Sequence, residues 1–210
     1  MAFVDSPKGG GKIMKKTAFG AVTCIIAMMF MLGPVFALEA PVITLERVDV
    51  ASIQPFFVKP RVEYKDEKEP GKELAAGSIL NLAYIFNIKN PNKESLMLDE
   101  MTFTTLFEGF EVNTAFYYED SWIPAGKTNQ VRVVVTNETL PTIGSLSVGA
   151  GNVEKLKEMK VSAGAIAKKW WESIGDFSFP IEVVGGTALF KTEKDKEIRS
   201  VFVGKFEKKN

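Results

Sequence analysis

The chain has 210 residues, of which 46% are apolar, and its 26 basic residues balance its 26 acidic residues. This composition supports a packed core, excludes an intrinsically disordered chain, and lacks the basic excess typical of proteins that bind DNA or RNA. Histidine is absent and Cys24 is the single cysteine, which excludes histidine-based triads, histidine-ligated metal sites and an internal disulfide framework.

Residues 1–37 are predicted to be an N-terminal extension and signal peptide. The segment contains a positive pair, an uncharged and mostly apolar run, a helix-breaking pair and a small residue at the expected cut: Lys15-Lys16, residues 17–36, Gly33-Pro34 and Ala37. This is the layout of a secretory signal that is cleaved between Ala37 and Leu38. Met14 is a better start for such a signal than Met1, because the thirteen preceding residues add nothing that a signal needs.

An uncleaved membrane anchor over residues 17–37 is the alternative, since the apolar run is about long enough to span a bilayer. In both interpretations the positively charged end stays in the cytoplasm and the rest of the chain crosses the membrane. After cleavage the protein is periplasmic or extracellular, whereas without cleavage it stays anchored with its domain outside the cytoplasm. The exported part, residues 38–210, keeps 22 of the basic and 25 of the acidic residues and is therefore mildly acidic.

Most of the exported part shows the two-residue alternation of half-buried β-strands. The alternation covers residues 42–54, 78–89, 101–107, 110–118, 130–136 and 177–183, and two short strands are expected near 187–191 and 198–206. A charged loop is expected over residues 63–77. Apolar residues at three- and four-residue spacing predict one amphipathic helix over about residues 151–174.

These elements predict a mainly β fold over residues 38–210. About seven short antiparallel strands separated by turns are typical of a β-sandwich of the immunoglobulin or fibronectin III kind. The predicted helix would cap one end of the sandwich or cover one sheet.

Two turn motifs punctuate the strands. Asn90-Pro91-Asn92 follows the strand over 78–89, and Pro91 stops that strand because proline cannot donate a ladder hydrogen bond. Ile123-Pro124-Ala125-Gly126 precedes the valine-rich strand over 130–136. In turns, asparagine side chains can hydrogen-bond backbone groups that have no partner strand. Both motifs are therefore interpreted as structural turns that fix strand pairing.

The order of these motifs resembles the type 2 late embryogenesis abundant (LEA) proteins, whose domain is also called WHy, for water stress and hypersensitive response. The resemblance covers residues 79–136 and extends more weakly over 177–206, where Gly185-Gly186 matches a glycine of a late strand. It implies a small folded β-sandwich with one helix, associated with desiccation, cold or osmotic stress. The long charged loop and the enlarged helical segment depart from the family pattern.

No enzymatic activity and no cofactor or metal are expected. The acidic pairs Asp99-Glu100 and Glu119-Asp120 are adjacent in sequence, and neighbours on a strand point to opposite faces, which does not suit an acid/base pair. The expected function is protection under stress, through weak contacts with client proteins or membrane surfaces and without nucleic acid.

The alternative function is binding or transfer of a small apolar ligand such as a lipid. It is motivated by an aromatic-rich hairpin: Phe103, Phe107, Phe110, Phe116, Tyr117 and Tyr118. The same residues are also what an ordinary sandwich core would need.

Expression in a bacterium tests the export interpretation. We expect the chain outside the cytoplasm with Leu38 as its first residue, because the signal layout places the cut after Ala37. N-terminal sequencing of the purified protein is the measurement. A mature protein that begins at Met1 or Met14 contradicts cleavage and favours the anchor.

Overall fold

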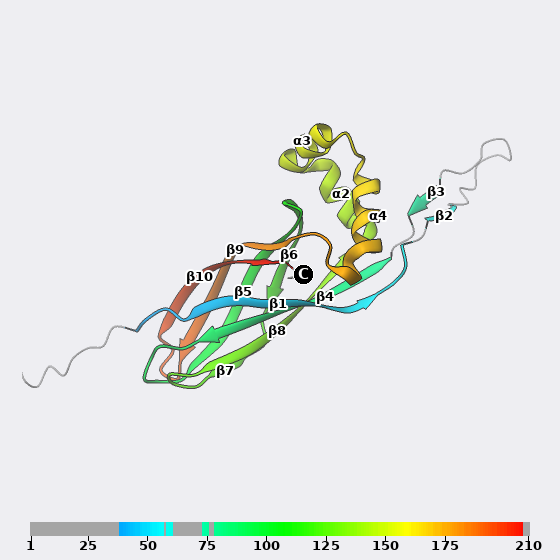
Figure 1. The fold of residues 1–210 in the computed structure, drawn as a ribbon. Coiled ribbons are helices and arrows are strands. Elements are labelled where there is room, and N and C mark those ends of the chain that lie inside the picture. Colours follow the sequence, from blue (N-terminus) through cyan, green and yellow to red (C-terminus); the bar gives the residue numbers. More distant parts are fainter. Residues whose placement is uncertain (1–37, 57, 61–72, 76–77, 208–210) are drawn as a thin grey trace, which may run out of the picture. The chain divides into compact units, whose positions relative to one another are not determined.

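Two antiparallel sheets make up most of the computed structural model, which describes residues 38–56, 58–60, 73–75 and 78–207 (Figure 1). A three-stranded sheet has the order β1 (Val42–Ile53), β4 (Ile79–Lys89), β8 (Thr128–Glu138). A five-stranded sheet contains β10 (Glu197–Phe206), β9 (Ile181–Thr192), β5 (Leu96–Phe107) and β6 (Phe110–Tyr117), with β7 (Ser121–Ile123) also paired to β5. The predicted mainly β, sandwich-like fold is confirmed.

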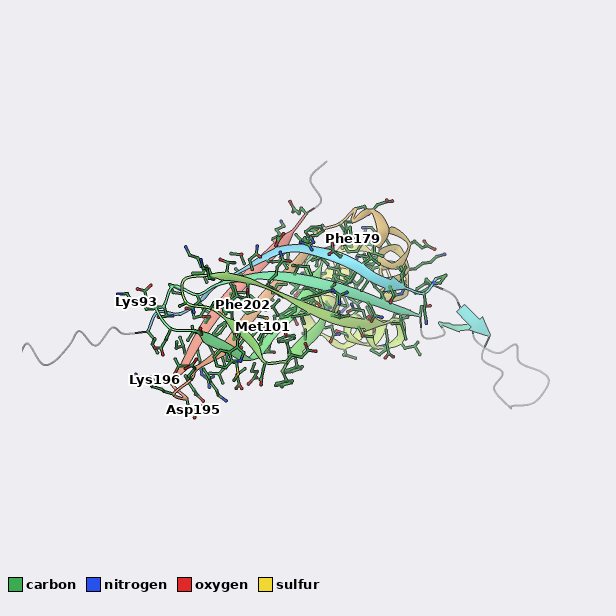
Figure 2. All side chains as sticks on the ribbon, turned by 90° about the horizontal axis from the view of Figure 1, so that it is seen from below. Lys93, Met101, Phe179, Asp195, Lys196 and Phe202 are labelled. Atoms are coloured by element: carbon green, nitrogen blue, oxygen red, sulfur yellow. The ribbon has the colours of Figure 1, made fainter. Side chains whose placement is uncertain are left out.

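Aromatic and aliphatic side chains from both sheets meet in the interior. Tyr84 and Phe86 of β4 contact Phe103 of β5, with ring centroids 5.5 and 5.1 Å apart. Phe202 of β10 lies 5.4 Å from Phe86, and Figure 2 shows Phe202 and Met101 in the middle of the sandwich. These contacts between strands of different sheets hold the two layers together, because fully buried aromatic rings contribute strongly to core stability.

Three α-helices lie between β8 and β9, whereas the sequence predicted one. They are α2 (Thr139–Val148), α3 (Ala150–Met159) and α4 (Ala163–Ser173), followed by the 3-10 turn η1 (Ile174–Asp176). The predicted helix over 151–174 is wrong as a single element because Lys160 adopts left-handed geometry, with φ 53°, and ends α3. The Ser162 side chain then caps α4 by accepting from the Ala165 N–H at 3.2 Å.

The helices cover one end of the sandwich, which we call the helical end. Trp170 of α4 is fully buried there, with its ring centroid 5.3 Å from that of Phe107 and 5.7 Å from that of Phe110. Glu108 lies in the tight β5–β6 turn with φ 49°, and its carboxylate accepts from the Trp170 indole at 2.9 Å and from Lys169 at 2.6 Å.

The opposite end of the sandwich contains the Asn90 turn and the β9–β10 turn, and we call it the turn end. Lys93, Asp195 and Lys196 lie there in Figure 2.

Several predicted strand limits also need correction. The separate strands expected over 177–183 and 187–191 are one strand, β9, which bulges at Gly185 with φ 59°. At Gly186 a Cβ would lie 2.6 Å from the Phe202 ring, so glycine there lets the ring reach the core. β5 begins at Leu96, earlier than expected, and β3 (Glu73–Ala75), paired with β2 (Val58–Pro60), lies within the predicted charged loop 63–77.

Among the described residues, three buried side-chain atoms have no hydrogen-bond partner: Asn137 Oδ1, Trp171 Nε1 and, in the core, the Tyr84 hydroxyl. Thr105 lies beside it, but the Thr105 hydroxyl donates to the Asn113 carbonyl at 3.2 Å. Burial is the main influence on the pKa of Tyr84 and raises it well above its ordinary value of 10.0, while neighbouring Thr105 opposes this shift. Tyr84 therefore stays neutral in the folded protein at pH values where tyrosine in the unfolded chain ionises.

Substitution Tyr84→Phe is expected to raise the free energy of unfolding by about 1 kcal/mol at pH 7, since it removes an unpaired buried hydroxyl. Above pH 10 the gain should widen, because only the wild-type unfolded state is stabilised by ionising a tyrosine that the folded state keeps neutral. Urea unfolding at both pH values measures this. Tyr117→Phe is the matched control and should not gain stability, as it loses a 3.0 Å hydrogen bond to Ser121. A destabilised Tyr84→Phe protein contradicts the assignment.

Candidate functional site

Asn90 joins the two sequence motifs through its side chain. Its Nδ2 donates to the carbonyls of Glu94 at 2.9 Å, Ile123 at 3.1 Å and Pro124 at 3.3 Å. Its Oδ1 accepts from the backbone N–H of Asn92 at 2.9 Å. The side chain is fully buried, so these bonds replace those that water would otherwise provide.

Asn92 reaches in the other direction, toward the start of the domain. Its Oδ1 accepts from the Glu39 backbone N–H and its Nδ2 donates to the Glu39 carbonyl, both at 2.8 Å. Its Nδ2 also donates to Asn90 Oδ1 at 3.1 Å. The carboxamide therefore pairs with Glu39 as a neighbouring strand would, and it fixes where the chain enters β1.

The second motif forms a tight turn against the first. The Lys127 N–H donates to the Pro124 carbonyl at 3.1 Å, and Gly126 has φ 66°, which favours glycine. The Gly126 N–H donates to the Asn92 carbonyl at 3.0 Å, and the Asn90 N–H donates to the Lys127 carbonyl at 2.9 Å. Ala125 lies between the residues that make these bonds, and Pro91 is exposed on the other turn.

We call this arrangement the asparagine clasp: Asn90 and Asn92 together with Glu39, Glu94 and residues 123–127. The hydrogen bonds of the two buried carboxamides are directed to the protein's own backbone and to each other, which is a structural use of these groups. The two carboxamide groups are themselves neither nucleophiles nor acids or bases at neutral pH.

The residues predicted for signal cleavage lie at the margin of the described chain. Ala37 and the apolar segment 17–37 are outside the described residues, and Leu38 directly precedes Glu39 of the clasp. In the described part of the chain, no helix is both long and apolar enough to span a membrane.

The acidic pairs considered in the sequence are not assembled into one centre. Asp99 forms an ion pair with Lys191 at 2.8 Å, and Glu119 and Asp120 lie exposed in the link between β6 and β7. Within residues 38–56, 58–60, 73–75 and 78–207, no group of three or more acidic, cysteine or histidine side chains is placed to hold a metal ion.

The aromatic-rich hairpin is divided between the core and the surface. Phe103, Phe107 and Phe110 are buried in the two aromatic clusters described above, whereas Phe116 and Tyr118 are exposed and Tyr117 is half-buried. Strict period-two alternation would place Phe110 and Phe116 on the same face of β6, but the strand has a register shift between its pairs with Thr105 and Leu106, so Phe110 faces the core and Phe116 faces outward.

Sequence reasoning missed Asn152, which covers the edge of β6. Its Oδ1 accepts from the Glu111 N–H at 3.1 Å and its Nδ2 donates to the Glu111 carbonyl at 2.9 Å. Lys155, one helical turn later, donates to the Gly109 carbonyl and lies over the Phe110 ring. An asparagine early in a helix is a weak signal, and nothing in the sequence indicated that it would reach a strand 41 residues away.

No family model and no curated protein sequence matches the chain. Among solved structures, AT1g01470 from Arabidopsis thaliana aligns at 11% identity and TM-score 0.42, covering 81% of this chain and 83% of that one. A structure described as a candidate late embryogenesis abundant protein, At2g46140.1, aligns at 10% identity and TM-score 0.40, with coverage of 92% and 85%.

A protein from Archaeoglobus fulgidus aligns at 8% identity and TM-score 0.33, covering 76% of this chain and 99% of that one. Likeness at these values of identity and TM-score carries no argument about function.

Removal of the clasp carboxamides should destabilise the protein. We expect Asn90→Ala and Asn92→Ala each to lower the free energy of unfolding by about 1–3 kcal/mol, because each leaves buried backbone groups unpaired. Urea unfolding measures the loss, and amide exchange at Glu39 should accelerate in Asn92→Ala.

The matched control is Asn129→Ala at the same end, where the side chain makes one exposed bond to the Trp122 carbonyl. Its effect should be smaller than that of either clasp variant. Equal effects of Asn129→Ala and Asn90→Ala would contradict the buried, structural role of the clasp.

Proposed function

We propose that this chain is an exported, non-catalytic stress-protective protein of the type 2 LEA (WHy-like) kind. It acts by weak contacts with client proteins or membrane surfaces when water is lost or temperature falls. Export follows from the predicted signal over residues 1–37, with the uncleaved anchor as the alternative route to the same compartment.

One observation supports this proposal above the others. The two motifs on which the resemblance was based, Asn90-Pro91-Asn92 and Ile123-Pro124-Ala125-Gly126, are far apart in sequence but are joined by one buried hydrogen-bond network. Because the two motifs bond to each other, their occurrence together supports the resemblance more strongly than either motif alone.

The chemistry of the described residues also agrees with a protective role. The asparagine carboxamides are bonded within the protein, and the acidic pairs are separated or exposed. The rings that motivated the ligand-binding alternative, Phe103, Phe107 and Phe110, pack against other core aromatics. We therefore place protection ahead of transport of an apolar ligand.

Drying a reporter enzyme with increasing amounts of residues 38–210 tests the proposal. Retained activity should rise gradually with the mass ratio, because many weak contacts act without one saturating pocket. An equal mass of an unrelated small globular protein is the control, and Asn92→Ala should still protect at temperatures where it stays folded.

The competing function gives a different result. Purification from a lipid-containing host, followed by solvent extraction and mass spectrometry, would recover lipid at fixed stoichiometry from a carrier. Stoichiometric lipid together with no protection of the dried enzyme would overturn the proposal.

A further inference from the structure

The outer faces of the two sheets differ in chemistry. On the three-stranded sheet the outer face mixes polar and apolar side chains: Ile85 is flanked in register by Arg47 and Arg132, Asn87 is flanked by Thr44 and Gln130, and Val134 is 45% exposed. The five-stranded sheet exposes apolar side chains to a greater extent, with Val201 at 83% and Phe116 at 60%. Exposed apolar side chains often mark interaction surfaces, so the outer face of the five-stranded sheet is a candidate for one.

Three exposed aromatic residues lie along the segment that runs from the end of β6 into β7, with Phe116 and Trp122 opposite positions five residues apart on β5. Phe116, Tyr118 and Trp122 are 60%, 65% and 46% exposed, and the Phe116 and Tyr118 rings lie parallel with centroids 6.3 Å apart. Glu119 and Asp120, both exposed, lie in the link between them. We call these five residues the aromatic–acidic patch. Rigid aromatic side chains are the residues that most often anchor protein interfaces.

A second exposed surface has the opposite charge. The turn from α3 to α4 presents Met159 and Val161, 49% and 37% exposed, beside the exposed lysines Lys157 and Lys160. We call these four residues the apolar–basic turn; the exposed Glu158 lies among them, so the two lysines leave residues 157–161 with a net charge of +1. Its backbone is closed by bonds from the Lys160 N–H to the Lys157 carbonyl and from the Val161 N–H to the Leu156 carbonyl, both 3.2 Å. Its shape is therefore fixed before any partner arrives, which lowers the entropic cost of binding.

The two surfaces belong to different ends of the sandwich. α3 is attached to β6 through Asn152 at Glu111, and Phe116 lies five residues further along that strand, roughly 17 Å away. Trp122 pairs with Met97 near the start of β5, whereas Glu111 pairs with Leu106 near its end. Figure 1 likewise shows α3 at the helical end and β7 at the turn end. The turn of one molecule therefore does not cover the patch of the same molecule.

We propose that the apolar–basic turn of one copy docks on the aromatic–acidic patch of a second copy. Apolar side chains would meet the aromatic rings, while Lys157 and Lys160 would face Glu119 and Asp120, so the contact is complementary in both polarity and charge. Because the two surfaces are different, the association is head-to-tail and adds further copies. This self-association is independent of the stress-protective proposal.

The contact is small, so the association is weak. Four residues docking on five fall well below the area of a stable interface, which is about 1,200 Å² or more in total. Assembly therefore becomes populated only when the protein is concentrated, and the loss of water is one condition that concentrates it.

Paired charge reversals test the proposal in residues 38–210. One variant carries Glu119→Lys with Asp120→Lys, and the other carries Lys157→Glu with Lys160→Glu. Each variant alone sets like charges against each other, whereas a mixture of the two restores both opposite pairs. The matched control reverses two exposed carboxylates away from both surfaces, Glu138→Lys with Asp176→Lys.

Sedimentation from about 10 µM to 1 mM is the measurement, a range chosen for weak contacts. We expect the average mass of the wild type and of the control to rise with concentration, and each reversed variant to associate at least about tenfold more weakly. Mixing the two reversed variants should recover association. Circular dichroism verifies that every variant is folded.

Trp122 supplies a second readout, because Trp170 and Trp171 are buried and Trp122 is exposed. Its emission should shift to the blue with concentration in the wild type and in the mixture, but not in either reversed variant. A wild type that stays monomeric at 1 mM overturns the proposal, as does a reversed variant that associates like the wild type. A blue shift only on addition of lipid vesicles assigns the patch to membranes and also overturns it.

Discussion

The turn end of the sandwich buries backbone groups that have no strand beside them, and these groups must be hydrogen-bonded for the fold to exist. Asn90 and Asn92 meet this constraint. Asn90 follows β4 of one sheet and donates to carbonyls at Glu94, just before β5, and at Ile123 of β7, both belonging to the other sheet. Asn92 also holds the segment that leads into β1, by bonding the backbone of Glu39. One pair of side chains thus fixes the relative position of both sheets and the point where the domain begins.

The helical end solves the same problem with different chemistry. There helices cover the β5–β6 turn and the edge of β6, where Asn152 pairs with the Glu111 backbone and Lys155 donates to the Gly109 carbonyl. Lys169 and Trp170 also hold the Glu108 carboxylate. The indole of Trp170 is anchored at its polar edge while its rings fill the core against Phe107 and Phe110. The helices therefore belong to the architecture of the sandwich.

This distribution of polar chemistry bears on function. The buried polar side chains that the sequence motifs indicated, Asn90 and Asn92, are hydrogen-bonded to the protein's own backbone and therefore have a structural role. What remains free is surface: parallel rings and carboxylates near β7, and apolar side chains with lysines after α3. Protection and association are therefore the functions that we propose.

The sequence by itself determined most of the longer strands, because period-two alternation is a local property that the buried face of a sheet requires. It also indicated that Asn90, Asn92 and residues 123–126 were turn devices, because proline and glycine restrict backbone geometry locally. Only the tertiary structure decided the rest. Lys160 ends α3 in left-handed geometry, and Gly185 makes a bulge that keeps β9 continuous, neither of which alternation or helical spacing specifies. Asn152 on Glu111, and the burial of Phe103 but not Phe116, depend on which segments distant in sequence pack together. No local pattern encodes that choice.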